Sequence, residues 1–248
     1  MPSIISIAFA ISGSILVAIA LYKVFQRINP ANVTEYLRCQ GEFWESELNN
    51  CSTGLDRVPQ QPVNTYTNVL YLTGGLLVMF EFNTLPTFVF SLAALFLCIA
   101  SALFHALSNY WSAKLDVSAM YAIFTALVVY AATTFFVIGD PLVALIMFIV
   151  AVIMGYLLTY VFSVNFIFGV PIIALLVFGL LIFNRSQQGL PIINVNWVVS
   201  LVLLLVGIVT FLFDKWRIFP IPRWGHGFWH ILTAIAIPLL FYSIYSIN

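Results

Sequence analysis

The segment LPTFVFSLAALFLCIASALFHAL, residues 85–107, contains no Asp, Glu, Lys or Arg, and His105 stands near its end. An α-helix rises 1.5 Å per residue, so the segment would extend for about 35 Å, which exceeds the ~30 Å of hydrocarbon in a bilayer. The segment therefore predicts a membrane-spanning helix. Because an ionisable group inside a bilayer is costly, the histidine near its end marks a candidate site.

Seven other apolar stretches are long enough to cross a bilayer, and turn residues separate most of them. They are residues 4–22, 64–82, 116–138, 141–162, 164–183, 195–213 and 227–246. Of the 248 residues, 62% are hydrophobic and 7% are charged, a composition that excludes a soluble protein of this size. We therefore expect an all-α, polytopic transmembrane helical bundle. Nine basic residues scattered along the chain also exclude a nucleic-acid partner.

The distribution of polar residues divides the chain into three parts. Residues 1–23 form an N-terminal transmembrane segment of the signal-anchor type, residues 24–63 form a polar loop, and residues 64–248 form a seven-helix core. A cleaved signal peptide is the alternative for the first part. That alternative is less favoured, because no basic residue precedes the apolar run while Lys23 and Arg27 follow it.

The basic residues indicate how the chain is oriented in its membrane. If the spans alternate, every basic residue except Arg185 lies on the side that holds the polar loop. Such an excess is typical of the cytoplasmic side, in a bacterial inner membrane or a eukaryotic endomembrane. A disulfide between Cys39 and Cys51 would indicate the opposite orientation, and the sequence leaves that pairing open.

The chain has three histidines, and all of them fall at the loop side of predicted helices. His105 ends one span, whereas His226 and His230 begin the last span and are four residues apart, on one helical face. If the helices close into a bundle, these imidazoles can converge in one leaflet. Three imidazoles form a complete protein ligand set for a catalytic zinc ion whose fourth position is open to water.

Two further polar residues occupy the same depth. Asp116 is expected in the first turn of its span, where a carboxylate could act as general acid and base, or could merely cap the helix. Ser101 lies one turn before His105 and could assist the attacking water, or could be a small packing residue. Asn64, Asn68 and Tyr71 share one helical face and predict either a polar seam between helices or part of a pocket lining.

Other interpretations of the histidines stay open at this point. A histidine at a helix end is often only an interfacial residue. The protein could be receptor-like, with a structural zinc that a fourth protein ligand closes. It could also be a b-type haem protein in which His105 and one of the other two histidines are the axial ligands.

The spacing Ser101-x3-His105-x10-Asp116, followed near the C-terminus by His226-x3-His230, resembles that of the alkaline ceramidases. This family belongs to a wider superfamily of seven-helix membrane hydrolases that includes adiponectin-receptor-like proteins and GPI-lipid remodelling factors. The run Asn-Thr-Tyr-Thr-Asn-Val-Leu-Tyr at residues 64–71 is also similar to the start of the first core helix in the family. The resemblance covers residues 51–246, about four-fifths of the chain.

The resemblance implies a role for each of these residues. His105, His226 and His230 would bind zinc, Asp116 would be the acid and base, and Ser101 would assist the attacking water. The reaction would be hydrolysis of the amide bond of a ceramide-like lipid, giving a sphingoid base and a fatty acid. A hydrolase of another acyl lipid is the alternative within enzymes.

The sequence departs from the family where eukaryotic members bind calcium. Those members carry a Glu directly after the cysteine of an Asp-Trp-Cys-Glu stretch and another Glu three residues before the first helix Asn. If Cys51 matches that cysteine, Ser52 and Gln61 stand at these two positions. Neither residue is a carboxylate, the ligand that Ca²⁺ prefers, so we do not expect calcium to be a cofactor.

Overall fold

The computed structural model describes residues 2–30, 58–135, 195–216 and 224–245, with scattered positions between 142 and 189 and between 218 and 221. Within these residues the chain is helical, and no strand is formed. The helices are α1 (Ile4–Arg27), α2 (Pro62–Thr67), α3 (Val69–Phe82), α4 (Leu85–Leu107), α5 (Tyr110–Phe135), α8 (Val195–Lys215) and α9 (Gly225–Tyr245). The predicted all-α class is confirmed for this part of the chain.

Within the described residues, four helices are long and apolar enough to cross a membrane, as an integral membrane protein requires. They are Ile4–Arg27, Leu85–Leu107, Val195–Lys215 and Gly225–Ser243. Most residues of the predicted spans 141–162 and 164–183 lie outside the described residues, so the core of seven helices stays a prediction.

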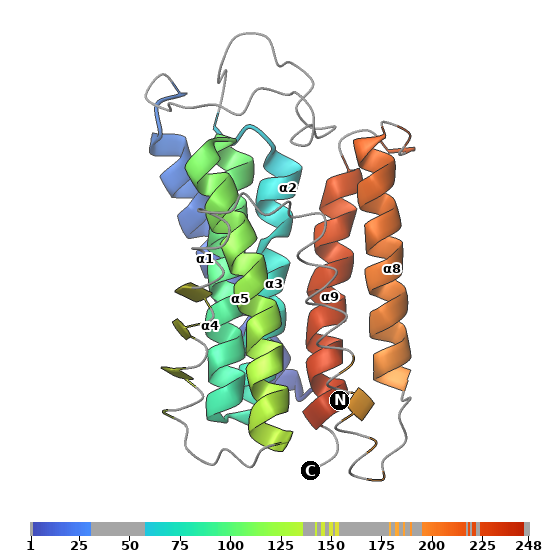
Figure 1. Cartoon of the computed structure of the whole chain (residues 1–248). Helices are drawn as coiled ribbons and strands as arrows, with labels where there is room; N and C mark the ends of the chain where they lie inside the picture. Colours follow the sequence, from blue (N-terminus) through green and yellow to red (C-terminus); the bar gives the residue numbers. More distant parts are fainter. Residues whose placement is uncertain are drawn as a thin grey trace.

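The long helices run side by side as a bundle (Figure 1). α3 packs against α1, α4 and α9, and α5 packs against α4. α8 packs on α9 at the edge of the bundle, and the Ser200 hydroxyl of α8 donates a 2.6 Å hydrogen bond to the Ala236 carbonyl of α9. In a bilayer, such contacts through small and polar residues hold helices together.

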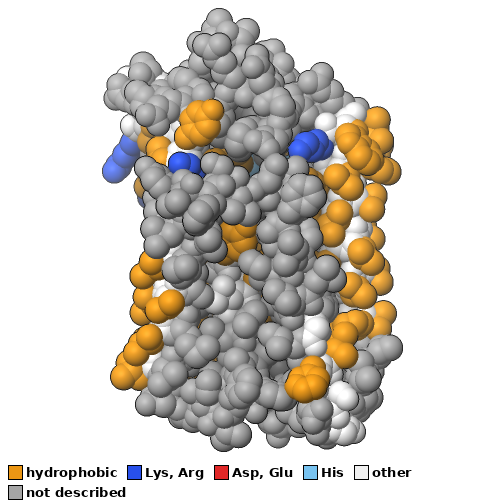
Figure 2. Space-filling view, viewed as in Figure 1, with side chains coloured by type: hydrophobic (Ala, Val, Ile, Leu, Met, Phe, Trp, Pro, Cys, Tyr) orange, Lys and Arg blue, Asp and Glu red, His pale blue; other side chains and the backbone are white. Residues whose placement is uncertain are grey.

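The outward faces are apolar. Figure 2 shows hydrophobic side chains along the outer edge of α8, where Val198, Val202, Leu205 and Val209 are exposed. The inward face of the same helix carries the buried residues Ser200, Gly207 and Asp214, each seven positions after the last. A helix with its polar residues inside and its apolar residues outside suits a lipid environment.

The N-terminal helix contacts the core. α1 begins after Ser3, whose hydroxyl accepts a 3.0 Å hydrogen bond from the Ser6 amide, as an N-cap residue does. Midway along the helix, Thr73 of α3 donates a 2.8 Å hydrogen bond to the hydroxyl of the buried Ser14. The segment that the sequence separates as residues 1–23 is therefore joined to α3 by packing and by a polar contact.

Two predicted helix boundaries were wrong. The span predicted over 64–82 is interrupted at Asn68, where α2 ends and α3 begins. α5 begins at Tyr110 instead of residue 116, because Asn109 precedes it and accepts a 3.1 Å hydrogen bond from the Ser112 amide. Asp116 therefore lies in the second turn of α5. The hydrophobic pattern had instead predicted that it lies in the first turn or caps the helix.

Candidate metal centre

The three histidines meet inside the bundle, as the sequence predicted. His105 lies in the last turn of α4, His226 and His230 lie in the first two turns of α9, and all three are buried. Their candidate ligand atoms lie within 4.8 Å of one another, and the ring centroids are 4.6–4.9 Å apart. This cluster can hold a metal ion.

Two glycines allow α9 to come close to its neighbours on either side of His226. A Cβ atom on Gly225 would lie 2.5 Å from the Cβ of Asp214 in α8, and one on Gly227 would lie 2.8 Å from Val63 Cγ1 in α2. The ring of Phe211 in α8 packs edge-on against the His226 imidazole, with centroids 5.3 Å apart. The start of α9 is thus held between α8 and α2.

The partner of His105 determines which ring nitrogen carries hydrogen. His105 Nδ1 lies 2.9 Å from Gln61 Oε1, and Asn64 Nδ2 donates a 2.7 Å hydrogen bond to the same oxygen. An amide oxygen only accepts hydrogen bonds, so His105 Nδ1 is the donor. The lone pair of the neutral ring is then on Nε2, where a metal ion can bind it.

The partners of His230 lead to the same tautomer. His230 Nδ1 lies 3.0 Å from the Thr67 hydroxyl, which donates its own hydrogen to the carbonyls of Val63 and Asn64 at 2.9 and 3.1 Å. A hydroxyl has one hydrogen, so Thr67 accepts from His230 Nδ1. Nε2 of His230 is again the nitrogen with the lone pair.

Ser101 and Asp116 come from α4 and α5. Ser101 is buried one turn before His105. Asp116 is half-buried, and its carboxylate acts electrostatically on the Tyr71 hydroxyl. The Tyr71 ring in turn lies 6.1 Å from the His230 ring, centroid to centroid. Among the described residues no carboxylate or thiol joins the histidine cluster, so Asp116 is not one of its members.

The polar face of Asn64, Asn68 and Tyr71 connects helices. The Tyr71 hydroxyl hydrogen-bonds Thr233 of α9, Asn64 hydrogen-bonds Gln61, and Asn68 donates to the Asn64 carbonyl at 2.8 Å. All three residues are buried. The Tyr71 contact ties α3 to α9, whereas the bonds of Asn64 and Asn68 lie within α2 and its caps.

The grouping of the imidazoles favours a shared metal ion over the haem interpretation. Two axial ligands would stand on opposite faces of a porphyrin. Here the rings of His105 and His230 are 4.9 Å apart, and His226 packs against both.

Two residues of the site were missed in the sequence. The sequence predicted of Gln61 only that it lacks the carboxylate of a calcium ligand, and it predicted no role for Thr67. Nothing local predicts their roles, because their histidine partners are 44 and 163 positions away in the chain. In the sequence, Gln61 stands three residues before Asn64, and Thr67 lies within the polar run that begins there.

Comparison of the chain with protein-family models, with curated proteins and with solved structures gave no match. The likeness to the alkaline ceramidases therefore rests on the residue spacings and on the run at residues 64–71. The described part of the chain is all-α, with helices that can span a membrane and a buried three-histidine cluster that can hold a metal ion.

Proposed function

We propose that this protein is a zinc-dependent membrane amidohydrolase that cleaves the amide bond of ceramide-like lipids to a sphingoid base and a fatty acid. The observation that carries the proposal is the convergence of His105, His226 and His230 inside an apolar bundle. Burying three imidazoles in a membrane protein has a cost, and a shared ion accounts for it.

The donor set suits zinc. Neutral imidazole nitrogens bind Zn²⁺ at ~2.0–2.1 Å, and catalytic sites supply three protein ligands. Nδ1 of His105 and of His230 donates a hydrogen bond, so in the neutral ring the lone pair is on Nε2, which points away from these partners. Imidazole also binds copper, iron and nickel. The support for zinc is therefore the set of three histidines, which is the usual number of protein ligands at a catalytic zinc ion.

The residues around the cluster provide the remaining chemistry. A bound zinc ion polarises a carbonyl and lowers the pKa of water toward ~7. Asp116 would take the proton from the attacking water and deliver it to the leaving nitrogen, so that the amide bond breaks with protons in balance. The Ser101 hydroxyl would donate a hydrogen bond to the oxygen that becomes negatively charged.

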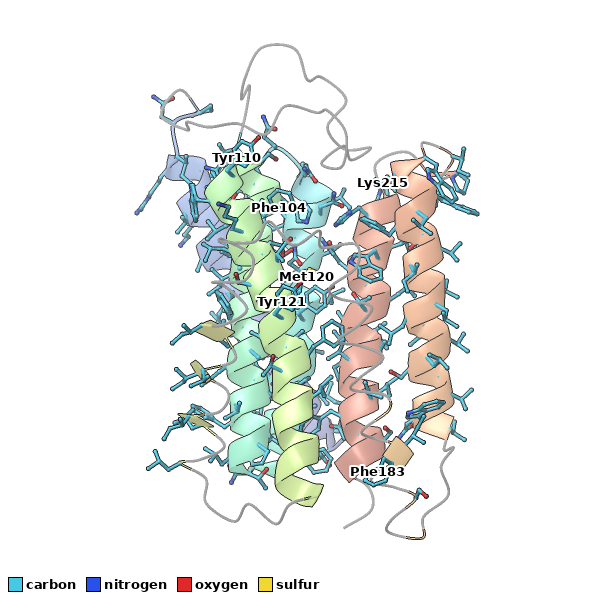
Figure 3. The ribbon with its side chains drawn as sticks, viewed as in Figure 1. Phe104, Tyr110, Met120, Tyr121, Phe183 and Lys215 are labelled. Carbon is cyan, nitrogen blue, oxygen red and sulfur yellow. The ribbon has the colours of Figure 1, made fainter. Side chains whose placement is uncertain are left out.

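The depth of the cluster fits a lipid whose scissile bond lies just below the headgroup. Tyr110, Trp111, Trp216 and Trp224 are exposed at one end of the bundle, as aromatic residues are at a membrane interface. His226 and His230 follow Trp224 by two and six residues, or about 3 and 9 Å along α9. In Figure 3, Tyr110 and Lys215 mark this end and Phe183 lies at the other.

The described basic residues support a cytoplasmic position for this end. α1 starts near the end of α3, since the Ser3 amide donates a 2.9 Å hydrogen bond to Glu81. The last turns of α1, with Lys23 and Arg27, therefore lie at the end of the bundle where α3 begins and the histidines gather (Figure 1). Lys114 and Lys215 belong to the same end, which agrees with the charge asymmetry of the loops.

The decisive experiment incubates purified protein with defined ceramides in detergent or liposomes and measures sphingoid base and fatty acid by mass spectrometry. We expect both products in equal amounts, their loss with a zinc chelator, and their return when zinc is added. Asp116→Asn is the matched control, because it should retain zinc. If the zinc-bound protein cleaves another acyl lipid but no ceramide, the proposed substrate is wrong. If it cleaves neither, the metal ion is structural.

A further inference from the structure

A short helix outside the ligand set contacts two of the three imidazoles. α2 and its N-cap residue contain Gln61 and Thr67, which hydrogen-bond His105 of α4 and His230 of α9. We propose that Gln61 and Thr67 are positioning residues that hold both histidines as Nδ1–H tautomers and so present Nε2 to the metal ion. The inference rests on the metal site of the proposed function and does not depend on the reaction.

Gln61 is fixed in place before it contacts the ring. Its backbone amide donates a 3.0 Å hydrogen bond to the His105 carbonyl, and the amide of Gln60 donates a 3.1 Å bond to Ala106. These bonds satisfy carbonyls at the end of α4 that have no partner within the helix. The side chain of Gln61 is fully buried, and Asn64 Nδ2 orients its oxygen toward His105 Nδ1. One residue thus binds both the backbone and the ring of the ligand.

Thr67 is fixed in the same manner. Its hydroxyl hydrogen is directed to the carbonyls of the preceding turn, so its lone pair points to His230 Nδ1. Gln61 and Thr67 stand six residues apart, at opposite ends of α2. Because α2 packs on both α4 and α9, it sets the two imidazoles relative to each other as well as their tautomers.

A neutral imidazole with the wrong tautomer presents N–H instead of a lone pair to the ion. Loss of the hydrogen-bond partners of metal-ligating histidines commonly weakens metal affinity 10–100-fold. Residues that merely stabilised the fold would instead lower the melting temperature and leave the affinity of the folded protein unchanged. The two roles can therefore be separated by measuring both quantities.

Thr67 offers a closely matched pair of variants. Thr67→Val keeps the branched shape and removes the acceptor, whereas Thr67→Ser keeps the hydroxyl. For Gln61, the pair is Gln61→Met, without an acceptor, and Gln61→Glu, with one. Zinc affinity is measured by competition with a chromophoric chelator on the full-length protein, and cobalt substitution reports ligand geometry through its visible absorption. The melting temperature of the metal-free protein is recorded for every variant.

We expect Thr67→Val and Gln61→Met to weaken zinc binding by about 10–100-fold and to alter the cobalt spectrum. Thr67→Ser and Gln61→Glu should retain wild-type affinity. Equal affinity in all four variants, with tight binding by the wild type, would overturn the inference and leave the proposed function intact. A wild-type protein that binds no zinc would overturn both. If Thr67→Val or Gln61→Met does not fold, the conservative variant at that position, Thr67→Ser or Gln61→Glu, provides the test. Weakened zinc binding by that variant would also count against the inference.

Discussion

The imidazole rings of His105 and His230 lie with their centroids 4.9 Å apart, although they belong to helices 125 positions apart in the chain. His105 lies in the last turn of α4, and His230 lies one turn after His226 near the start of α9. The C-terminal end of α4 therefore meets the N-terminal end of α9. Both rings are buried beneath the polar end of the bundle.

Replacing His105 with Ala should remove most of the bound metal. Three imidazoles are the minimum set of a catalytic zinc site, so we expect about one zinc per wild-type chain and little in the variant. Elemental analysis of protein purified without chelators measures this. Ser101→Ala, on the same helix and equally buried, is the control and should keep its zinc. Absence of zinc from the wild type would contradict the metal assignment.

Asp116→Asn should retain zinc and lose most turnover of a fluorescent ceramide. An amide cannot act as a general base, and general-base contributions are on the order of 10²–10⁴-fold in rate. The structure excludes the alternative that Asp116 caps α5, because it lies in the second turn. Near-normal turnover in the variant would show that another group moves the proton.

Calcium should have no effect on activity. Gln61, which stands where the resembled family has an acidic residue, directs its oxygen to His105 and to Asn64 instead. Activity is measured after chelator treatment, with zinc and calcium added back separately. Recovery should follow zinc alone. A reproducible increase with calcium on top of zinc would point to carboxylates in the loop, such as Glu42, Glu45 or Glu47.

Gly225→Ala should destabilise the start of α9 and reduce zinc content. The added Cβ would lie 2.5 Å from Asp214 Cβ and 2.6 Å from its Oδ1, so α8 and α9 would have to separate next to His226. Overpacking of this kind typically costs about 1–3 kcal/mol. Thermal unfolding in detergent and metal analysis test both effects. Gly179→Ala is the control, since its Cβ would meet nothing within 4 Å.

The site should face the cytoplasmic leaflet, because all basic residues except Arg185 are predicted on its side. A membrane-impermeant thiol reagent should therefore label Cys39 and Cys51 only after cells are permeabilised. These two residues lie outside the described part of the chain. Cys98 is fully buried in α4 and should contribute no background. Labelling of intact cells, or an oxidised Cys39–Cys51 pair, would reverse the orientation.

The sequence by itself determined the helical class, most long helices and the three histidines of the candidate metal centre. Helix length and hydropathy are local properties, so α4 agrees with its predicted span 85–107 at both ends. The spacing of His226 and His230 places them on one helical face wherever that helix lies. The limits of the spans and their alternating direction then place all three histidines at one end of the bundle.

Only the tertiary structure decided what surrounds the ligands. The break at Asn68, the early start of α5 and the partners of both imidazole Nδ1 atoms depend on caps and contacts that hydrophobic periodicity does not record. Gln61 and Thr67 acquire their roles because α2 packs between α4 and α9. A hydrogen bond between residues far apart in the chain exists only when the helices that carry them have come together, so no local pattern of residues can specify it.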